Sequence, residues 1–169
     1  MDVEMCNLKG QNEQTLRIQV LQFVEQSQND ELGDIEPGTM IVCRRYFPVV
    51  DFFIHTLSGL KLFIQLSESK YQNHLKKLPD LFKSKVSPGD DKSGKETVFE
   101  YFYSRSKGSL RKRNSSPNDC LYLYITTIPS AEACQRSCKG AHAGVRLICK
   151  DHLERLGNLW QISSLYARH

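Results

Sequence analysis

The chain has 169 residues, of which 25% are charged and 40% hydrophobic, with a formal net charge of +4 and a sequence pI near 8.7. This length suits one domain whose hydrophobic core is stable without disulfide bonds or bound metal ions. No apolar run reaches the roughly 18 residues of a membrane span, and the first residues lack a secretory signal. We therefore expect an intracellular protein without a membrane partner, whose six cysteines are reduced thiols and whose mild positive charge favours polyanions.

The first part of the chain is predicted to contain a flexible start, a helix and a strand. Residues 1–12 are polar and are expected to be flexible, so that a single domain occupies residues 13–169. The apolar residues within 15–26 recur at helical spacing, which predicts an amphipathic helix lying on a sheet. They are Leu16, Val20, Phe23 and Val24. After a turn-rich connection, residues 39–46 are predicted to form the first strand.

Two apolar runs, residues 49–55 and 60–66, predict a β-hairpin, because both are rich in Val, Ile and Phe. The residues between them include Leu57-Ser58-Gly59. In short hairpin connections of this length the last residue commonly has a left-handed backbone conformation, which glycine adopts readily. The hairpin is therefore expected to have a defined turn.

The register of this hairpin decides whether two oxygen-bearing side chains meet. If Thr56 pairs with Leu60, Asp51 lies opposite Gln65 at the end of the hairpin away from its turn. Side chains directly opposite one another on one face have Cβ atoms about 5 Å apart. A slip of one residue would place them on opposite faces, so the predicted pair of oxygen ligands depends on the turn.

The same residues carry a resemblance to a known family. Pro48-x-x-Asp51, fourteen residues before Gln65-x-Ser67, resembles the core motif of the PD-(D/E)xK nuclease superfamily. The most similar group is the nuclease-like domain of Crinkler and retrotransposon hot-spot proteins, in which the second acidic position is often Gln. There the lysine position is often a hydroxyl residue followed by a basic stretch and His, as in QLSESKYQNH at residues 65–74. The resemblance implies an α/β fold, a three-layer α/β/α sandwich with a mixed central sheet (restriction-endonuclease-like), and metal-dependent hydrolysis of phosphodiester bonds in nucleic acid.

The resemblance also assigns roles to five residues. Asp51 and Gln65 would bind a magnesium ion (Mg²⁺), or Mn²⁺ in its place, through oxygen atoms. Ser67 stands at the lysine position, and Lys70 could swing back to supply the missing charge, although an ordinary surface lysine is the alternative. His74 could contact phosphate, orient water or cap the site. For the whole chain, the alternative to a nuclease is a catalytically inactive nuclease fold that serves nucleic-acid or protein interaction.

The second half of the chain is predicted to combine helices and strands. Helices are predicted over residues 71–82, 96–103, 130–138 and 151–156, and strands over residues 120–128 and 145–149. The strand over 120–128 is expected to be central. A helix, several strands and then a strand–helix–strand unit again favour a three-layer α/β sandwich with a mixed sheet.

Residues 105–118 form a predicted basic loop. Its candidate nucleic-acid-binding residues are Lys107, Arg111, Lys112 and Arg113. The loop is open to three interpretations: a solvated loop, a patch that follows phosphates, or a nuclear import signal. Nucleic acid is the expected partner, with DNA in preference to RNA.

A second candidate site is a zinc site at Cys134, Cys138 and His142, with Cys149 and His152 downstream. Cysteines four residues apart share one helix face. Structural zinc generally requires two close ligand pairs, and the second pair is poorly formed here. Buried thiols that pack as small hydrophobic groups are therefore the favoured interpretation.

Overall fold

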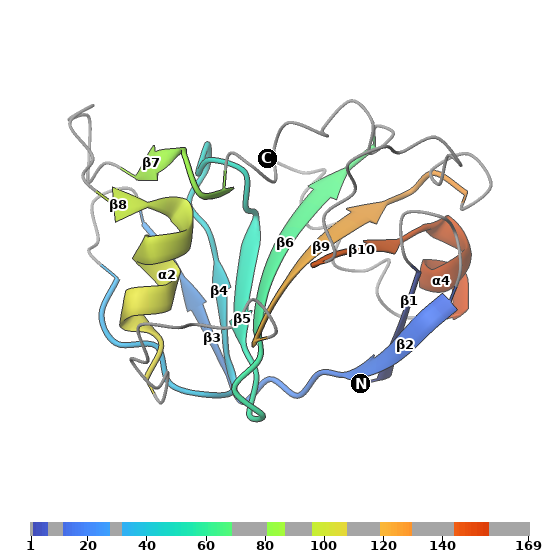
Figure 1. The fold of residues 1–169 in the computed structure, drawn as a ribbon, viewed down its shortest axis with the longest axis horizontal. Helices are drawn as coiled ribbons and strands as arrows, with labels where there is room; N and C mark the ends of the chain where they lie inside the picture. The colour runs from blue at the N-terminus through green and yellow to red at the C-terminus, as the bar shows by residue number, and fades with distance from the viewer. Residues whose placement is uncertain are drawn as a thin grey trace.

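The computed structural model describes residues 2–6, 12–27, 32–68, 81–86, 96–107, 119–129 and 144–155. Its larger sheet contains β1 (Asp2–Cys6), β2 (Asn12–Arg17), β3 (Gln22–Glu25), β4 (Thr39–Val42), β5 (Phe52–His55), β6 (Lys61–Ser67), β9 (Cys120–Thr126) and β10 (Val145–Ile148). The other described elements are β7 (Lys85–Val86), β8 (Glu96–Thr97), α2 (Val98–Arg105) and α4 (Lys150–Arg155). The eight strands lie side by side in the order β2-β1-β10-β9-β6-β5-β4-β3 (Figure 1).

The sheet is mixed, as predicted. β5 is antiparallel to both β4 and β6, whereas β9 is parallel to both β6 and β10. The strand predicted to be central, β9, therefore has a neighbour on each side. The α/β class with a mixed sheet is confirmed, with a low helix content in the described residues. None of the helices in the described ranges combines the length and apolarity that a membrane crossing requires.

The hairpin of β5 and β6 has the predicted register. The Thr56 N–H donates to the Leu60 carbonyl at 2.9 Å, and Phe53 pairs with Phe63. Gly59 has a φ of +85°, the left-handed conformation expected of the residue that closes the turn. The turn thus fixes which side chains of the two strands share a face.

The predicted helix over residues 15–26 is wrong. These residues contribute to β2, β3 and the connection between them. Leu16 and Ile18 are buried while Arg17 between them is exposed, which is the alternation of a strand with one buried face. Phe23, which the helical pattern counted as core, is 71% exposed in β3.

The N-terminal residues also differ from the prediction. Residues 2–6, within the start that was predicted to be flexible, form β1, which pairs with β2 and with β10. Most of this pairing is with β2, over five residue pairs, and a single pair, Cys6 with Leu147, joins β1 to β10. Met5 of β1 is fully buried.

Several predicted elements of the second half are confirmed. The helix over 96–103 is α2, which begins two residues later after β8, and the last predicted helical turns are α4. The two predicted strands are β9 and β10. The predicted helix over 130–138 lies outside the described residues, as does nearly all of the one over 71–82.

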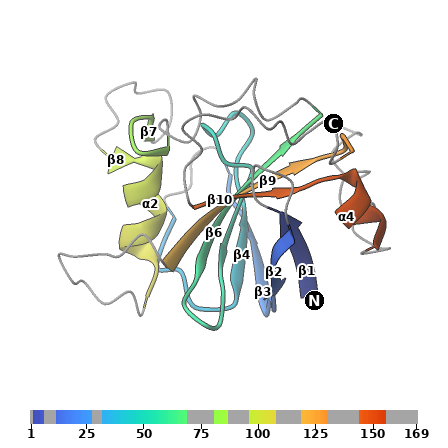
Figure 2. The ribbon, with the colours of Figure 1, turned by 45° about the vertical axis from the view of Figure 1, so that its right-hand side comes forward.

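Two apolar clusters pack on opposite faces of the sheet, because neighbouring residues of a strand point to opposite sides. The cluster on the α2 face includes Phe53, Phe63, Val98, Phe102, Tyr122 and Tyr124. The other includes Phe52, Ile54, Leu62, Ile64, Leu123 and, from α4, Leu153. In the first, the Phe102 and Phe53 rings stack with centroids 4.5 Å apart. Figure 2 shows α2 and α4 on opposite sides of the molecule.

Candidate functional site at the end of the hairpin

The predicted site lies at one edge of the sheet, where several strand ends meet. Because β5 is antiparallel to β4 and β6, the connection from β4 to β5 lies at the same edge as the carboxyl ends of β6 and β9 (Figure 1). Asp51 directly precedes β5, and Gln65 and Ser67 belong to the last part of β6. The fold therefore brings the three residues to one place.

Asp51 lies beside Gln65 through contacts to both backbone neighbours of that residue. Its N–H donates to the Ile64 carbonyl at 2.8 Å, and its Oδ2 accepts the Leu66 N–H at 2.7 Å. The paired register of β5 and β6 ends one residue earlier, at Phe52 and Ile64. The Asp51 carboxylate thus accepts a hydrogen bond from a backbone N–H of β6, just beyond the last residues that pair β5 with β6.

The side chain of Gln65 is held by a tyrosine from the neighbouring strand. Gln65 is 8% exposed, and its Oε1 lies 2.7 Å from the Tyr122 hydroxyl. The same hydroxyl lies 3.0 Å from the Val49 carbonyl oxygen. Because a tyrosine hydroxyl carries one proton, it is shared between these two acceptors. Tyr122 therefore ties β6 and β9 to the β4–β5 connection.

Two further polar groups adjoin this edge. Burial raises the pKa of the Tyr124 hydroxyl, and a hydrogen bond with the Ser67 side chain opposes that shift. Burial also raises the pKa of the Cys43 thiol, and the nearby Asp51 carboxylate adds to the effect. Cys43 therefore stays a neutral thiol, and the Ser67 hydroxyl engages Tyr124 and brings no charge.

The connection between β4 and β5 has an unusual backbone. Tyr46 and Val49 have φ angles of +63° and +57°, in the left-handed region that is uncommon for residues other than glycine. Such conformations cost on the order of 1–3 kcal/mol each and persist where the surroundings hold them. Here the Val49 carbonyl meets Tyr122, and Phe47 is 8% exposed in the core.

The donor set at this edge fits one mode of Mg²⁺ binding. A carboxylate offers about four acceptor positions and an amide oxygen two, so the bonds to Leu66 and Tyr122 do not by themselves exclude a metal. Mg²⁺ commonly binds through one or two carboxylates, with waters and substrate phosphates completing its shell. Within the described ranges, no group of three or more His, Cys, Asp or Glu side chains could hold a metal ion. Asp51 and Gln65 therefore suit a metal site whose coordination shell is completed by water and substrate rather than by protein ligands alone.

Several predicted site residues cannot be placed at this edge. Lys70 and His74 lie outside the described residues, as do Arg111, Lys112 and Arg113 of the basic loop.

Lys107 is the one candidate nucleic-acid-binding residue of the basic loop that lies within the described residues. It forms ion pairs with Asp34 and Glu36. The Glu36 carboxylate, followed by Asp34, raises the pKa of the Lys107 amine. Its charge is therefore balanced by neighbours within the fold.

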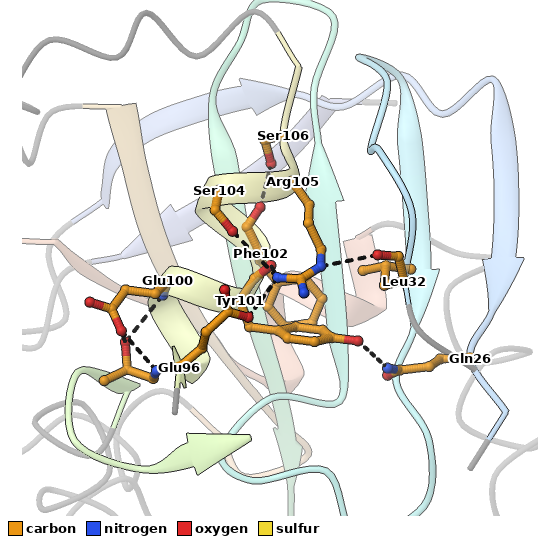
Figure 3. A network of polar contacts seen from close by, with 10 residues as sticks. Gln26, Leu32, Glu96, Glu100, Tyr101, Phe102, Ser104, Arg105 and Ser106 are labelled. Carbon is orange, nitrogen blue, oxygen red and sulfur yellow. Dashed lines mark hydrogen bonds and ion pairs between the residues drawn. The ribbon is translucent and has the colours of Figure 1, made fainter. Parts of the chain in front are cut away.

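Arg105, which begins the predicted basic loop, belongs to a network that fixes α2 (Figure 3). Its guanidinium donates to the Leu32 carbonyl at 3.0 Å and to Glu96 at 2.8 Å, and it lies 4.3 Å from the Tyr101 ring centroid. The Tyr101 hydroxyl in turn accepts a hydrogen bond from Gln26 at 2.8 Å. We assign this network to packing of α2 against the sheet.

The described part of the predicted zinc site has a structural explanation. Cys149 is fully buried in the cluster on the α2 face. The His152 Nδ1 accepts the Cys149 N–H at 3.0 Å, which caps the start of α4. Cys134, Cys138 and His142 lie outside the described residues.

Sequence reasoning missed Tyr122 and Tyr124 as part of the site. Alternation along β9 places both on the same face, and this pattern is readable in CLYLYIT. What the pattern does not reveal is the neighbour of β9. The pairing of Phe63 with Tyr122 sets these hydroxyls beside Gln65 and Ser67.

Comparisons of the chain with protein-family models, with curated proteins and with solved structures find no match. A functional assignment must therefore start from the residues and contacts at this edge.

Proposed function

We propose that this chain is a nuclease-fold domain that binds nucleic acid and hydrolyses its phosphodiester bonds with Mg²⁺, or with Mn²⁺ in its place. The observation that carries the proposal is the contact of Asp51 with both backbone neighbours of Gln65. The contact places Asp51 next to Gln65 in the hairpin, which supports the pairing of these two residues that the nuclease motif implies. DNA is the proposed substrate in preference to RNA.

A three-layer α/β/α arrangement is part of the same proposal. Two observations support it. α2 packs on one face of the mixed sheet, and Leu153 of α4 belongs to the cluster on the other face. The proposed arrangement would be the restriction-endonuclease-like sandwich that the resemblance implies.

Asp51 and Gln65 would hold the metal ion in this proposal. A bound Mg²⁺ would supply a water of lowered pKa and offset charge on the scissile phosphate. Tyr122 would orient the Gln65 oxygen through its hydroxyl. Since Ser67 carries no charge, Lys70 is the proposed cation near the phosphate, and His74 the proposed phosphate contact.

A second candidate is a nuclease fold without catalysis, which binds nucleic acid or protein. The observation that favours it is that Asp51 and Gln65 each already make a short hydrogen bond within the fold, at 2.7 Å. In that case Asp51 stabilises the end of the hairpin and has no metal to bind.

The test compares Asp51→Asn with wild type in two assays, Mn²⁺ binding by calorimetry and cleavage of labelled DNA and RNA. Asparagine keeps an oxygen that can accept the Leu66 N–H, so the variant removes charge rather than the backbone contact. Asp34→Asn, at a carboxylate that is 69% exposed, is the matched control. We expect metal binding and cleavage to disappear in Asp51→Asn and to remain in the control.

Equal cleavage by wild type and Asp51→Asn would contradict the proposed metal site. Binding of nucleic acid by wild type, without metal binding or cleavage, would support the non-catalytic candidate. The two readouts therefore separate the candidates.

A further inference from the structure

We infer that the connection between β4 and β5, residues 43–51, binds single-stranded nucleic acid. Tyr46 stacks on an unpaired base, and Arg44 and Arg45 contact phosphates. The inference rests on the proposed function and deepens it, because it names the form of the substrate and the surface beside Asp51 that receives it.

The first observation is the exposure of Tyr46. Its side chain is 84% exposed, the highest value among the exposed large hydrophobic residues of the described ranges. Its backbone has a φ of +63°, a conformation that non-glycine residues seldom adopt. Packing within the described fold does not account for an aromatic ring at this position.

The second observation is that the chain on both sides of Tyr46 is firmly held. The Phe47 N–H donates to the Arg44 carbonyl at 3.0 Å, which closes a turn with Tyr46 at its tip. The Phe47 ring packs in the core, 5.4 Å from the Phe102 ring between centroids. At the base, the Cys43 N–H donates to the Asp51 carbonyl at 2.9 Å. A turn whose backbone is already held in this way loses little backbone conformational entropy on binding.

The third observation is the positive charge of the two residues that precede Tyr46. The Arg45 guanidinium lies 4.9 Å from the Tyr46 ring centroid, and the Arg44 guanidinium lies 6.0 Å from that of Phe47. Guanidinium groups both stack on aromatic faces and bind phosphate in a bidentate manner. Basic groups interleaved with aromatic rings are the arrangement that binds single strands without sequence preference.

The chemistry favours a single strand over a duplex. A base within a duplex is already stacked on its neighbours, whereas an unpaired base has a free face for an aromatic side chain. Tyr46 is five residues before Asp51, so the two Cα atoms lie within about 18 Å of one another in any conformation. A strand held on Tyr46 is therefore within reach of the candidate metal site.

The test measures binding of the full chain to a labelled oligothymidylate by fluorescence anisotropy in EDTA, with a duplex of equal length for comparison. We expect tighter binding of the single strand, and a decrease of about 5- to 150-fold in affinity for Tyr46→Ala. Tyr46→Phe should retain most of the affinity. Phe23→Ala, which removes an exposed ring from β3, is the matched control and should bind as wild type.

Two further variants sharpen the result. Tyr46→Gly removes the ring where glycine suits the left-handed backbone, so weak binding by this folded variant cannot be attributed to strain. Arg44→Gln combined with Arg45→Gln should reduce the slope of log K against log salt by about 0.7 for each phosphate that the arginines neutralise. Lys85→Gln, at an exposed lysine of β7, is the charge control and should leave the slope unchanged.

Wild-type affinity in Tyr46→Ala and Tyr46→Gly would overturn the inference, as would absence of wild-type binding to oligothymidylate. Because the assay contains EDTA, the binding that it measures does not require a metal ion. Tyr46-dependent binding without any cleavage would refute only the catalytic proposal. Metal-dependent cleavage that is indifferent to Tyr46 would refute only the role of Tyr46 in substrate binding.

Discussion

The carboxylate of Asp51 accepts the backbone N–H of Leu66 at 2.7 Å, so one side chain joins the start of β5 to the end of β6. A hydrogen bond to a charged group contributes about 1.5–3 kcal/mol to stability. The candidate metal ligand is therefore also a structural residue, and the two roles can be separated by substitution.

We expect Asp51→Ala to lower the free energy of unfolding by about 1.5–3 kcal/mol, because the Leu66 N–H loses its acceptor. Asp51→Asn should cost clearly less, since its amide oxygen can still accept the bond. Urea denaturation of both variants checks this, with Asp34→Asn as the control at an exposed carboxylate. Equal, negligible decreases for both Asp51 variants would show that the hydrogen bond with Leu66 does not stabilise the fold.

Tyr122→Phe should lower the free energy of unfolding by about 1–3 kcal/mol, because the buried oxygen of Gln65 and the Val49 carbonyl lose their donor. Tyr103→Phe is a suitable comparison, since its hydroxyl donates at 3.0 Å to Asp119, which is 39% exposed and can bind water instead. The decrease in that variant should be smaller. Urea denaturation of the two variants in parallel checks this prediction. A larger decrease in the free energy of unfolding for Tyr103→Phe than for Tyr122→Phe would contradict it.

The parts of the fold that could be predicted from sequence are those with local signals. The hairpin register follows from a three-residue connection that ends in glycine, and Gly59 adopts the left-handed φ that this requires. β9 and β10 are apolar runs with turn residues around them. In each case the neighbours that decide the structure lie within a few residues.

The N-terminal strands could not be predicted because their sequence fits two patterns. Leu16 and Val20 fit one face of a helix, whereas Leu16, Ile18 and Val20 alternate as in a strand. The structure has the second pattern in β2, which pairs with β1, and β1 in turn pairs with β10 from the other end of the chain. Non-local pairing of this kind leaves no local signal.

The candidate site likewise has one part set by local sequence and one part set by non-local strand pairing. Asp51 and Gln65 belong to one hairpin, so their proximity was predictable. Tyr122 lies 57 residues after Gln65, and its hydrogen bond depends on β9 pairing with β6. Tyr46 was missed because it was assigned to the strand predicted over residues 39–46, whereas β4 ends at Val42 and Tyr46 lies exposed in the connection that follows.

The buried His55 should make stability depend on pH. Burial, followed by the nearby Lys61 charge, lowers the pKa of its imidazole from the usual 6.5, while the Ile35 carbonyl and Glu36 oppose the shift. Below about pH 6.5 the unfolded chain therefore takes up a proton that the folded chain does not. As the pH is lowered through this range, the free energy of unfolding decreases by up to about 1.4 kcal/mol per pH unit. Above this pH the effect disappears.

The measurement is the free energy of unfolding from pH 7.5 to 5 for wild type and His55→Gln. The other four histidines are common to both proteins, so the difference between the two curves isolates His55. Parallel curves would show that His55 takes up its proton equally in the folded and unfolded states.

Cys120 should be unreactive at pH 8 although its side chain is only partly buried. Burial, followed by the adjacent Asp119 carboxylate, raises the pKa of its thiol to about 12, and its Sγ lies 3.4 Å from the Asp119 Oδ1. Because the thiolate is the reactive form, alkylation by iodoacetamide should be on the order of 10³ times slower in the folded protein than in the unfolded chain. Asp119→Asn should speed the reaction by removing the repelling charge, and Lys61→Met should slow it, because the Lys61 amine favours the thiolate. Peptide mapping of the Cys120 adduct by mass spectrometry distinguishes it from the other thiols. Equal rates in wild type and Asp119→Asn, with both proteins folded, would show that the carboxylate does not control this thiol.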